Sequence, residues 1–190
     1  MIRRQHHIDM CNGPLWNKIL LFALPLMASS ILQLLFNAAD VVVVGRYAGK
    51  EALAAVGSNS ALINLLINLF VGLSVGTNVV VARDLGAGRH DNVSRSVHTS
   101  ITLALISGVG MAVFGVIMVR HLLEWMSSPT DVIDLATVYL RIYFLGMPAL
   151  ALYNFGNAVF SAIGDTKKPL VYLSIAGALN IVLNLFFVIV

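Results

Sequence analysis

One carboxylate lies deep inside an apolar stretch of this sequence. Asp40 follows a long hydrophobic run, and four valines at 41–44 separate it from the next polar segment. Gln33 and Asn37 precede it at spacings of seven and three residues, which place the three side chains on one helix face. Ionisable groups at membrane depth usually mark ion or substrate pathways. We therefore expect Asp40 to couple to Na⁺ or H⁺, and the sequence suggests no other metal site.

A structural interpretation of Asp40 competes with this one. The aspartate could lie near the outer interface of a membrane and pair with Arg46 or Lys50. Aspartate is a short side chain, however, and four residues of helix put about 6 Å between it and the interface. The functional interpretation is favoured.

Amides repeat at helical spacing in three further apolar blocks. Such side chains often only join one helix to another, and each hydrogen bond then contributes about 1 kcal/mol. Polar stripes on four helices nevertheless favour a shared polar cavity. The stripes are Asn64 with Asn68, Asn154 with Asn157 and Ser161, and Asn180 with Asn184. We expect a substrate cavity lined by Gln33, Asn37, Asn64, Asn68 and Asn154.

Helix breakers add a mechanical possibility. Pro25 and Pro148 each remove a backbone hydrogen bond inside an apolar block, and are therefore candidate hinges. Ordinary proline kinks are the alternative. Gly72 and Gly76 form a small-xxx-small motif that predicts close helix packing.

Composition identifies the class of protein. Of 190 residues, 58% are hydrophobic and 11% charged, whereas soluble domains carry about a quarter charged residues. The net charge of +3 gives little support to a nucleic-acid partner. The single cysteine, Cys11, excludes an internal disulfide. The five histidines show no spacing typical of a metal site or a catalytic dyad, so an enzyme is not expected, and no cofactor is implied.

The apolar residues form blocks long enough to cross a bilayer, which takes about 20 helical residues. We predict an all-α, polytopic bundle with a tail at 1–15 and a transmembrane lobe at 16–190. The last block ends without flanking charge, and we expect the chain to be truncated in its fifth helix. The predicted spans are 16–44, 52–81, 97–120, 133–163 and 170–190.

Lysine and arginine predict the orientation, because cytoplasmic loops are enriched in them. Eight lie in the N-terminal segment and in the second and fourth connectors, three lie on the opposite side, and Arg141 falls within a span. The N-terminus is therefore expected in the cytoplasm, with the lobe in the plasma (inner) membrane.

Taken in order, the motifs resemble one family, the multidrug and toxic compound extrusion (MATE) transporters. The resemblance covers nearly the whole chain. It implies twelve helices in two six-helix lobes that export cationic or amphipathic drugs in exchange for Na⁺ or H⁺, so that a C-terminal lobe is missing here. The residues that carry it are Leu24-Pro25, Asp40, Gly45, 51–57, Gly76, 82–89, 139–142, Gly146, Pro148, 164–167, Pro169 and 179–184.

The resemblance also implies roles for single residues. Asp40 stands where the family has its first-helix carboxylate, Asn180 matches a cation-site asparagine, and Asn157 a polar residue near that site. Asn184 is a departure, since several relatives have aspartate at this position. The implied cation site would hold one carboxylate fewer.

Three other functions stay open. A lipid-linked oligosaccharide flippase of the same broad superfamily would share the architecture, but would need several Arg or Lys in its cavity for pyrophosphate. A membrane-embedded enzyme would need paired catalytic groups at depth. A structural subunit that transports nothing would leave the burial of Asp40 unexplained.

Overall fold

The computed structural model describes residues 15–129 and 132–189, and every element in that part of the chain is helical. The tail predicted at 1–15 lies almost wholly outside the described residues. The elements are α1 (Leu15–Val43), the π-helix η1 (Val44–Ala48), α2 (Gly49–Gly86), α3 (His90–Trp125), α4 (Ile133–Leu145), α5 (Met147–Ala162) and α6 (Lys167–Ile189).

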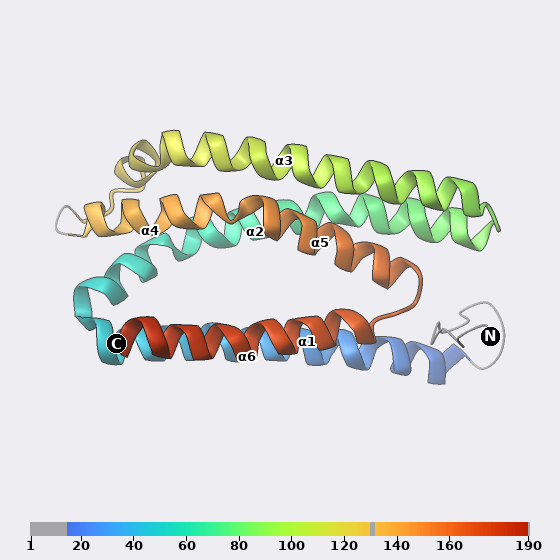
Figure 1. Ribbon diagram of the computed structural model, residues 1–190, viewed down its shortest axis with the longest axis horizontal. Helices are drawn as coiled ribbons and strands as arrows, with labels where there is room; N and C mark the ends of the chain where they lie inside the picture. The colour runs from blue at the N-terminus through green and yellow to red at the C-terminus, as the bar shows by residue number, and fades with distance from the viewer. Residues whose placement is uncertain (1–14, 130–131, 190) are drawn as a thin grey trace.

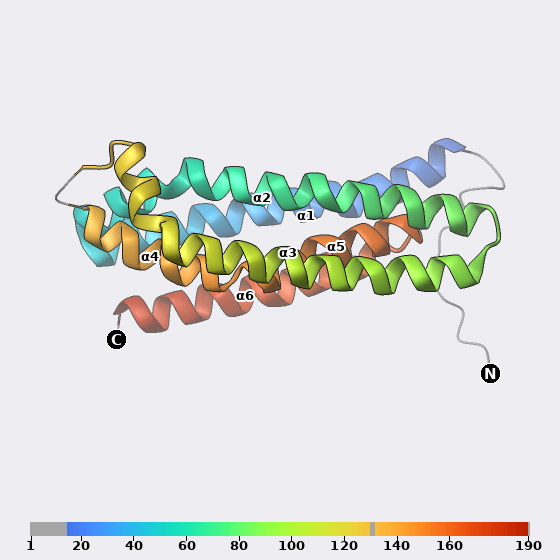
Figure 2. The same cartoon turned by 90° about the horizontal axis from the view of Figure 1, so that it is seen from above.

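The helices form two layers that run along the same long axis (Figure 1). One layer is the parallel pair α1 and α6, and the other contains α2, α3, α4 and α5. The view from above shows α1 and α6 lying beneath different parts of the second layer (Figure 2). The first layer joins the second at η1 at one end and at the α5–α6 turn at the other.

Apolar composition makes these helices suitable for a bilayer. Within the described residues, three helical stretches are long and apolar enough to cross, and the bent pair α4–α5 would make a fourth. The first stretch, Trp16–Gly86, has 71 residues. A straight helix of that length would measure about 106 Å, far more than one bilayer. It folds back at η1 and therefore holds the first two predicted spans (Figure 1).

The helices α2 and α5 end in the same backbone motif. After α2, the Arg89 N–H donates to the Asp84 carbonyl at 2.9 Å, and Gly88 has a φ of +69°. After α5, the Asp165 N–H donates to the Phe160 carbonyl at 2.9 Å, and Gly164 has a φ of +79°. These are Schellman motifs, in which a left-handed glycine satisfies the last carbonyls of a helix.

Two boundaries differ from those expected. The predicted span 133–163 is two helices, since α4 ends at Leu145, α5 begins at Met147, and their axes differ by 48°. Pro148 stands in the first turn of α5, where its missing N–H costs nothing. The charged connector expected between the second and third spans is helical except around 87–89, so α2 and α3 extend past the predicted spans.

The apolar core lies entirely within the four-helix layer. Its buried residues come from α2, α3, α4, α5 and Val132, with Phe70, Leu123, Phe144 and Phe155 among the largest. Among residues whose side chains are described, α1 has none that is buried. The core therefore stabilises α2 to α5 as one unit.

Two glycines of α3 allow the bent pair to pack closely. A Cβ at Gly115 would lie 1.9 Å from the ring of Phe144, and a Cβ at Gly108 would lie 2.6 Å from the Cα of Pro148. The small-xxx-small motif had predicted close packing at Gly72 and Gly76 instead. A Cβ at Gly72 or Gly76 would meet nothing within 4 Å, so the expectation of close packing there is wrong within the described chain.

The α3 contact gives a first prediction. We expect Gly115→Ala to destabilise the protein by about 1–3 kcal/mol, because the added methyl overlaps the Phe144 ring in a packed interior. Thermal unfolding of the purified protein in detergent measures it as a lower Tm. Gly110→Ala is the matched control on the same helix, where the Cβ has open space. Equal Tm values for the two variants would contradict the packing account.

Candidate functional site

The helices α1 and α6 approach closely because a glycine of one receives an aromatic ring of the other. A Cβ at Gly177 would lie 1.9 Å from the ring of Phe36, so only glycine fits this crossing. Phe36 stands one helical turn before Asp40, and Gly177 two turns before Asn184. The close contact therefore brings Asp40 and Asn184 face to face.

Asp40 and Asn184 form a hydrogen bond between these two helices. The Nδ2 of Asn184 donates to Oδ1 of Asp40 and lies 3.5 Å from Oδ1 of Asn180. Asp40 and Asn184 are partly buried, and Asn180 is exposed. Three of the four residues expected at the cation site are thus brought together, from elements 144 positions apart.

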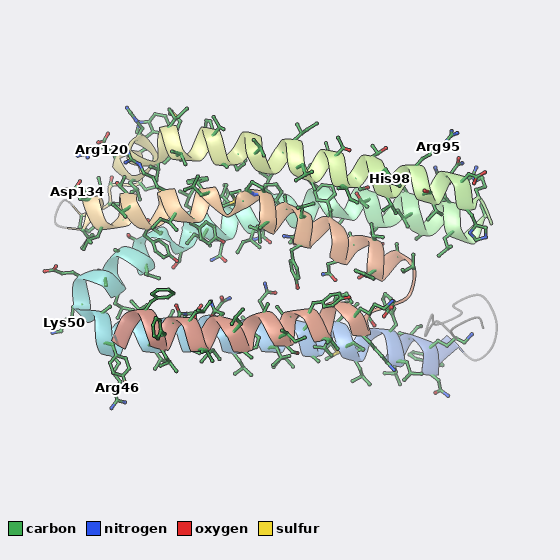
Figure 3. The ribbon with its side chains drawn as sticks, in the orientation of Figure 1. Arg46, Lys50, Arg95, His98, Arg120 and Asp134 are labelled. Atoms are coloured by element: carbon green, nitrogen blue, oxygen red, sulfur yellow. The ribbon has the colours of Figure 1, made fainter. Side chains whose placement is uncertain are left out.

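The competing interpretation of Asp40 finds no support in this arrangement. None of the ion pairs formed among the described residues includes Asp40. Arg46 and Lys50 are exposed at the end of the molecule, where Figure 3 shows both side chains pointing outward. The carboxylate is instead met by an amide, which leaves its negative charge uncompensated.

The fourth expected member, Asn157, lies on α5. Its side chain is partly buried, and its Oδ1 is a buried oxygen without a hydrogen-bond partner in the described part of the chain. Buried acceptors are almost always satisfied, so an unpaired one calls for an explanation. An amide oxygen of this kind is available to a bound ion, a substrate or water.

The amides expected to line a cavity do not gather around Asp40. Asn68 donates to the backbone carbonyl of Asn64 at 2.7 Å, and Asn154 to that of Leu150 at 2.9 Å, so both bonds stay within one helix. Gln33 and Asn37 are exposed on α1. The role of these residues as a cavity lining stays a prediction.

Other polar groups, which the sequence did not single out, join the four-helix layer. Asn59 is fully buried and donates to the Ala136 carbonyl at 3.3 Å, and Asn78 donates to the Ala158 carbonyl at 2.9 Å. The hydroxyls of Thr77 and Ser100 are 3.0 Å apart. In the sequence, only the presence of single amides in an apolar block could have indicated these contacts. The acceptors of both amides are backbone carbonyls, which a pattern of residue types does not identify.

Two tyrosines of α4 stack on each other and pack against the core of the four-helix layer. The ring centroids of Tyr139 and Tyr143 lie 6.5 Å apart, and both side chains are partly buried.

The two expected hinges differ in their surroundings. The helix α1 continues through Pro25, whose carbonyl accepts from the Ser29 hydroxyl at 2.8 Å, and Ser30 bonds Leu26 in the same way. Such back-bonding tends to bend helices. Pro148 instead lies at the break before α5 and against Gly108. Pro25 is thus placed in a locally softened helix and Pro148 at a packed corner.

Charged side chains gather at the two ends of the bundle. Arg46, Lys50, Arg120 and Asp134 lie at one end, and Arg95 at the other (Figure 3). Arg120 pairs with Asp134 at 3.3 Å, which ties α3 to α4 there. At the opposite end, Arg89 pairs with the buried Asp84 at 2.9 Å. Arg3 and Arg4 lie outside the described residues.

Comparison with known proteins decides the family. The MatE family model matches residues 25–186, most of the chain. This chain belongs to the MatE family. The expected resemblance to MATE transporters is confirmed, and with it the all-α, polytopic fold and the expectation that the chain is not an enzyme.

Individual relatives of this MatE chain agree with that assignment. A probable multidrug resistance protein of Bacillus subtilis, YoeA, is 32% identical over 88% of the chain and 36% of its own length. An FAD transporter of Shewanella oneidensis is 23% identical over 92% of the chain and 38% of its own length. The chain thus spans well under half the length of these curated relatives.

Solved structures agree as well. A MOP superfamily transporter from Pyrococcus furiosus, described as having a binding pocket of reversed polarity, superimposes with a TM-score of 0.89 at 28% identity. The match covers 98% of the MatE chain and 41% of that transporter. The two-layer arrangement is therefore that of a MatE lobe.

The site geometry predicts a specific cross-link. In a Cys11→Ser background, Asp40→Cys with Asn184→Cys should form a disulfide under mild oxidant, because the two side chains are in contact. Peptide mass spectrometry after digestion detects it. Asp40→Cys with Val182→Cys is the matched control, since Val182 is 61% exposed and lies two residues, or about 160° around the helix, from Asn184. Equal cross-linking of both pairs would contradict the assigned facing of α6.

Proposed function

We propose that this chain is the N-terminal lobe of a twelve-helix transporter that exports drugs or other cationic or amphipathic molecules in exchange for Na⁺ or H⁺. One observation carries the proposal, namely the hydrogen bond from Asn184 to Asp40, whose carboxylate forms no ion pair with any described residue. A lone carboxylate is costly in a low-dielectric site, and a monovalent cation or a proton removes that cost. No cofactor beyond the coupling ion is required.

The oxygens around Asn184 support cation binding. Its Nδ2 lies where Oδ1 of Asp40 and Oδ1 of Asn180 converge. An amide carries two donors on nitrogen and an acceptor on oxygen. Rotation of the Asn184 amide would replace the donor by its oxygen and create a site with three converging oxygens. Na⁺ accepts such ligands, and a proton on Asp40 would be held by the same acceptors.

Coupling follows from the difference between the two charge states. With a cation bound, Asp40 is neutralised and stable in an apolar setting. Without it, the carboxylate favours packing that keeps it hydrated or hydrogen-bonded. An ion shifts a two-state equilibrium by its differential affinity for the states. The softened segment of α1 around Pro25 and Ser29 is a place where α1 could respond.

For the transported molecule we propose only a broad chemical class. Curated relatives are named for multidrug resistance and, in one case, for FAD, so the substrate class differs among similar proteins. A polar cavity lined by Gln33, Asn37, Asn64, Asn68 and Asn154 suits an amphipathic cation. The flippase alternative would need several cationic groups beside the cavity. Arg46, Lys50, Arg95 and Arg120 lie toward the ends of the bundle, which leaves Arg141 on α4 as the arginine within a predicted span.

The proposed location is the plasma (inner) membrane with the N-terminus in the cytoplasm. Lys18, Arg95 and Lys167 are all near one end of the bundle, as the charge distribution requires. The positive-inside rule assigns that end to the cytoplasm.

Cysteine labelling tests this topology. In a Cys11→Ser background and intact cells, a membrane-impermeant maleimide should react with Lys50→Cys, which is exposed at the other end. Arg89→Cys and Lys167→Cys should react only after permeabilisation. The opposite pattern would reverse the orientation.

Export driven by an ion gradient tests the coupling site. In proteoliposomes of the complete transporter, Asp40→Asn should reduce transport to background, because it removes the only charge of the site. Asn184→Ala should weaken cation affinity by roughly 10- to 100-fold, as a hydrogen bond to a charged group contributes about 1.5–3 kcal/mol. Transport is measured at equal protein under imposed Na⁺ and H⁺ gradients.

Asp134→Asn is the matched control for charge removal. It changes the same functional group at an exposed rim position paired with Arg120. It should leave gradient-driven export largely intact. Undiminished export by Asp40→Asn would return that residue to a structural role.

A further inference from the structure

The described residues form two bodies that share little packing with each other. The four-helix body, α2 to α5, contains the whole apolar core formed by the described residues. The two-helix body, α1 with η1 and α6, is held together by the Phe36–Gly177 contact and the Asp40–Asn184 hydrogen bond. The helix α1 packs against α6 and η1, and α6 against α1, η1 and α5.

Contacts between the bodies concentrate beside the connections. Phe160 on α5 lies 6.3 Å from the ring of Tyr172 on α6, and the Lys168 Nζ lies 5.6 Å from the Phe160 ring centroid. All three residues flank the α5–α6 turn. At the other end, η1 contacts the start of α2.

Each connection contains a glycine in a backbone conformation that other residues rarely adopt. Gly49, between η1 and α2, has φ +88° and ψ 176°, a region that is essentially restricted to glycine. Gly164, between α5 and α6, has φ +79°. Hinges are usually a few residues at element ends that absorb large changes in φ and ψ.

We infer that the two-helix body swings as one unit about the line joining Gly49 and Gly164. These glycines lie at opposite ends of the bundle (Figure 1), so their line runs along the long axis. Two pivots at opposite ends permit rotation about that line and oppose other rigid-body motions. The motion changes the distance between α6 and α3 and leaves the α1–α6 contact intact. It requires no bend in α1 and no break at Pro148.

Distances between spin labels test this motion in the complete transporter, reconstituted in lipid nanodiscs in a Cys11→Ser background. Labels at the exposed residues Ile31 and Ile175 report within the two-helix body, and labels at Ile106 and Val138 within the four-helix body. The pair Ile106 and Ile175 spans the two. Distributions are recorded by pulsed electron resonance, with and without Na⁺ and at acidic and neutral pH.

We expect a narrow, condition-independent distance within each body and a broad or two-component distance between the bodies. A between-body distribution as narrow and constant as the other two would overturn the inference. So would a broad Ile31–Ile175 distribution, because α1 and α6 would then move separately.

Glycine substitutions locate the pivots. Gly49→Ala and Gly164→Ala penalise the backbone conformation seen here and should shift the two between-body populations by about fivefold or more, given the usual cost of left-handed backbone for alanine. Gly88→Ala is the matched control, since Gly88 has φ +69° but lies within the four-helix body. If Gly88→Ala shifts the populations equally, the pivots are misplaced; if the two test variants leave them unchanged, the axis is refuted. The wild-type distributions decide the inference if a variant fails to fold.

Discussion

A carboxylate inside an apolar helix must be met by another polar group, and this requirement sets how α1 and α6 pack. Asp40 is met by Asn184, and the two can meet only because Gly177 lets Phe36 approach closely. Burying an unpaired charge would cost far more than the few kcal/mol by which a protein is stable. The amide reduces that cost without removing the charge, and on the proposed function a cation or a proton would neutralise it.

The described helices fall into two groups, a core-forming layer of α2 to α5 and the α1–α6 pair that carries Asp40 and Asn184. The described core lies in α2 to α5, where α3 glycines receive Phe144 and Pro148 and buried amides bond to backbone carbonyls of neighbouring helices. The α1–α6 pair contributes nothing to that core and carries the charge. Elements that move in function are drawn from the weakly packed part of a structure, and the inferred swing of the α1–α6 pair agrees with that rule.

Sequence patterns predicted the helical, membrane-type fold, because it follows from long apolar blocks, while the role of Asp40 stays a prediction. Sequence patterns did not predict contacts between residues that are far apart in the sequence. Gly72 and Gly76 match a packing motif but face open space, whereas Gly108 and Gly115 pack against α5 and α4 without one. Continuous hydrophobicity joined α4 and α5 into one predicted span, although Pro148 was a candidate hinge beside the break at Gly146. Family resemblance, rather than spacing, assigned Asn180 and Asn184 to the cation site, and the hydrogen bonds place both beside Asp40.

Asn184 gives the site a definite charge balance. On the proposed function, one carboxylate and two amides carry a single negative charge, which one monovalent cation or one proton neutralises. A second carboxylate at this position, as the resemblance implies for several relatives, would repel the first and require a shared proton or a second ion. The amide donates to Asp40 instead and is neutral at every pH. On the proposed function, a single-charge site therefore takes up one monovalent cation or one proton for each change of state.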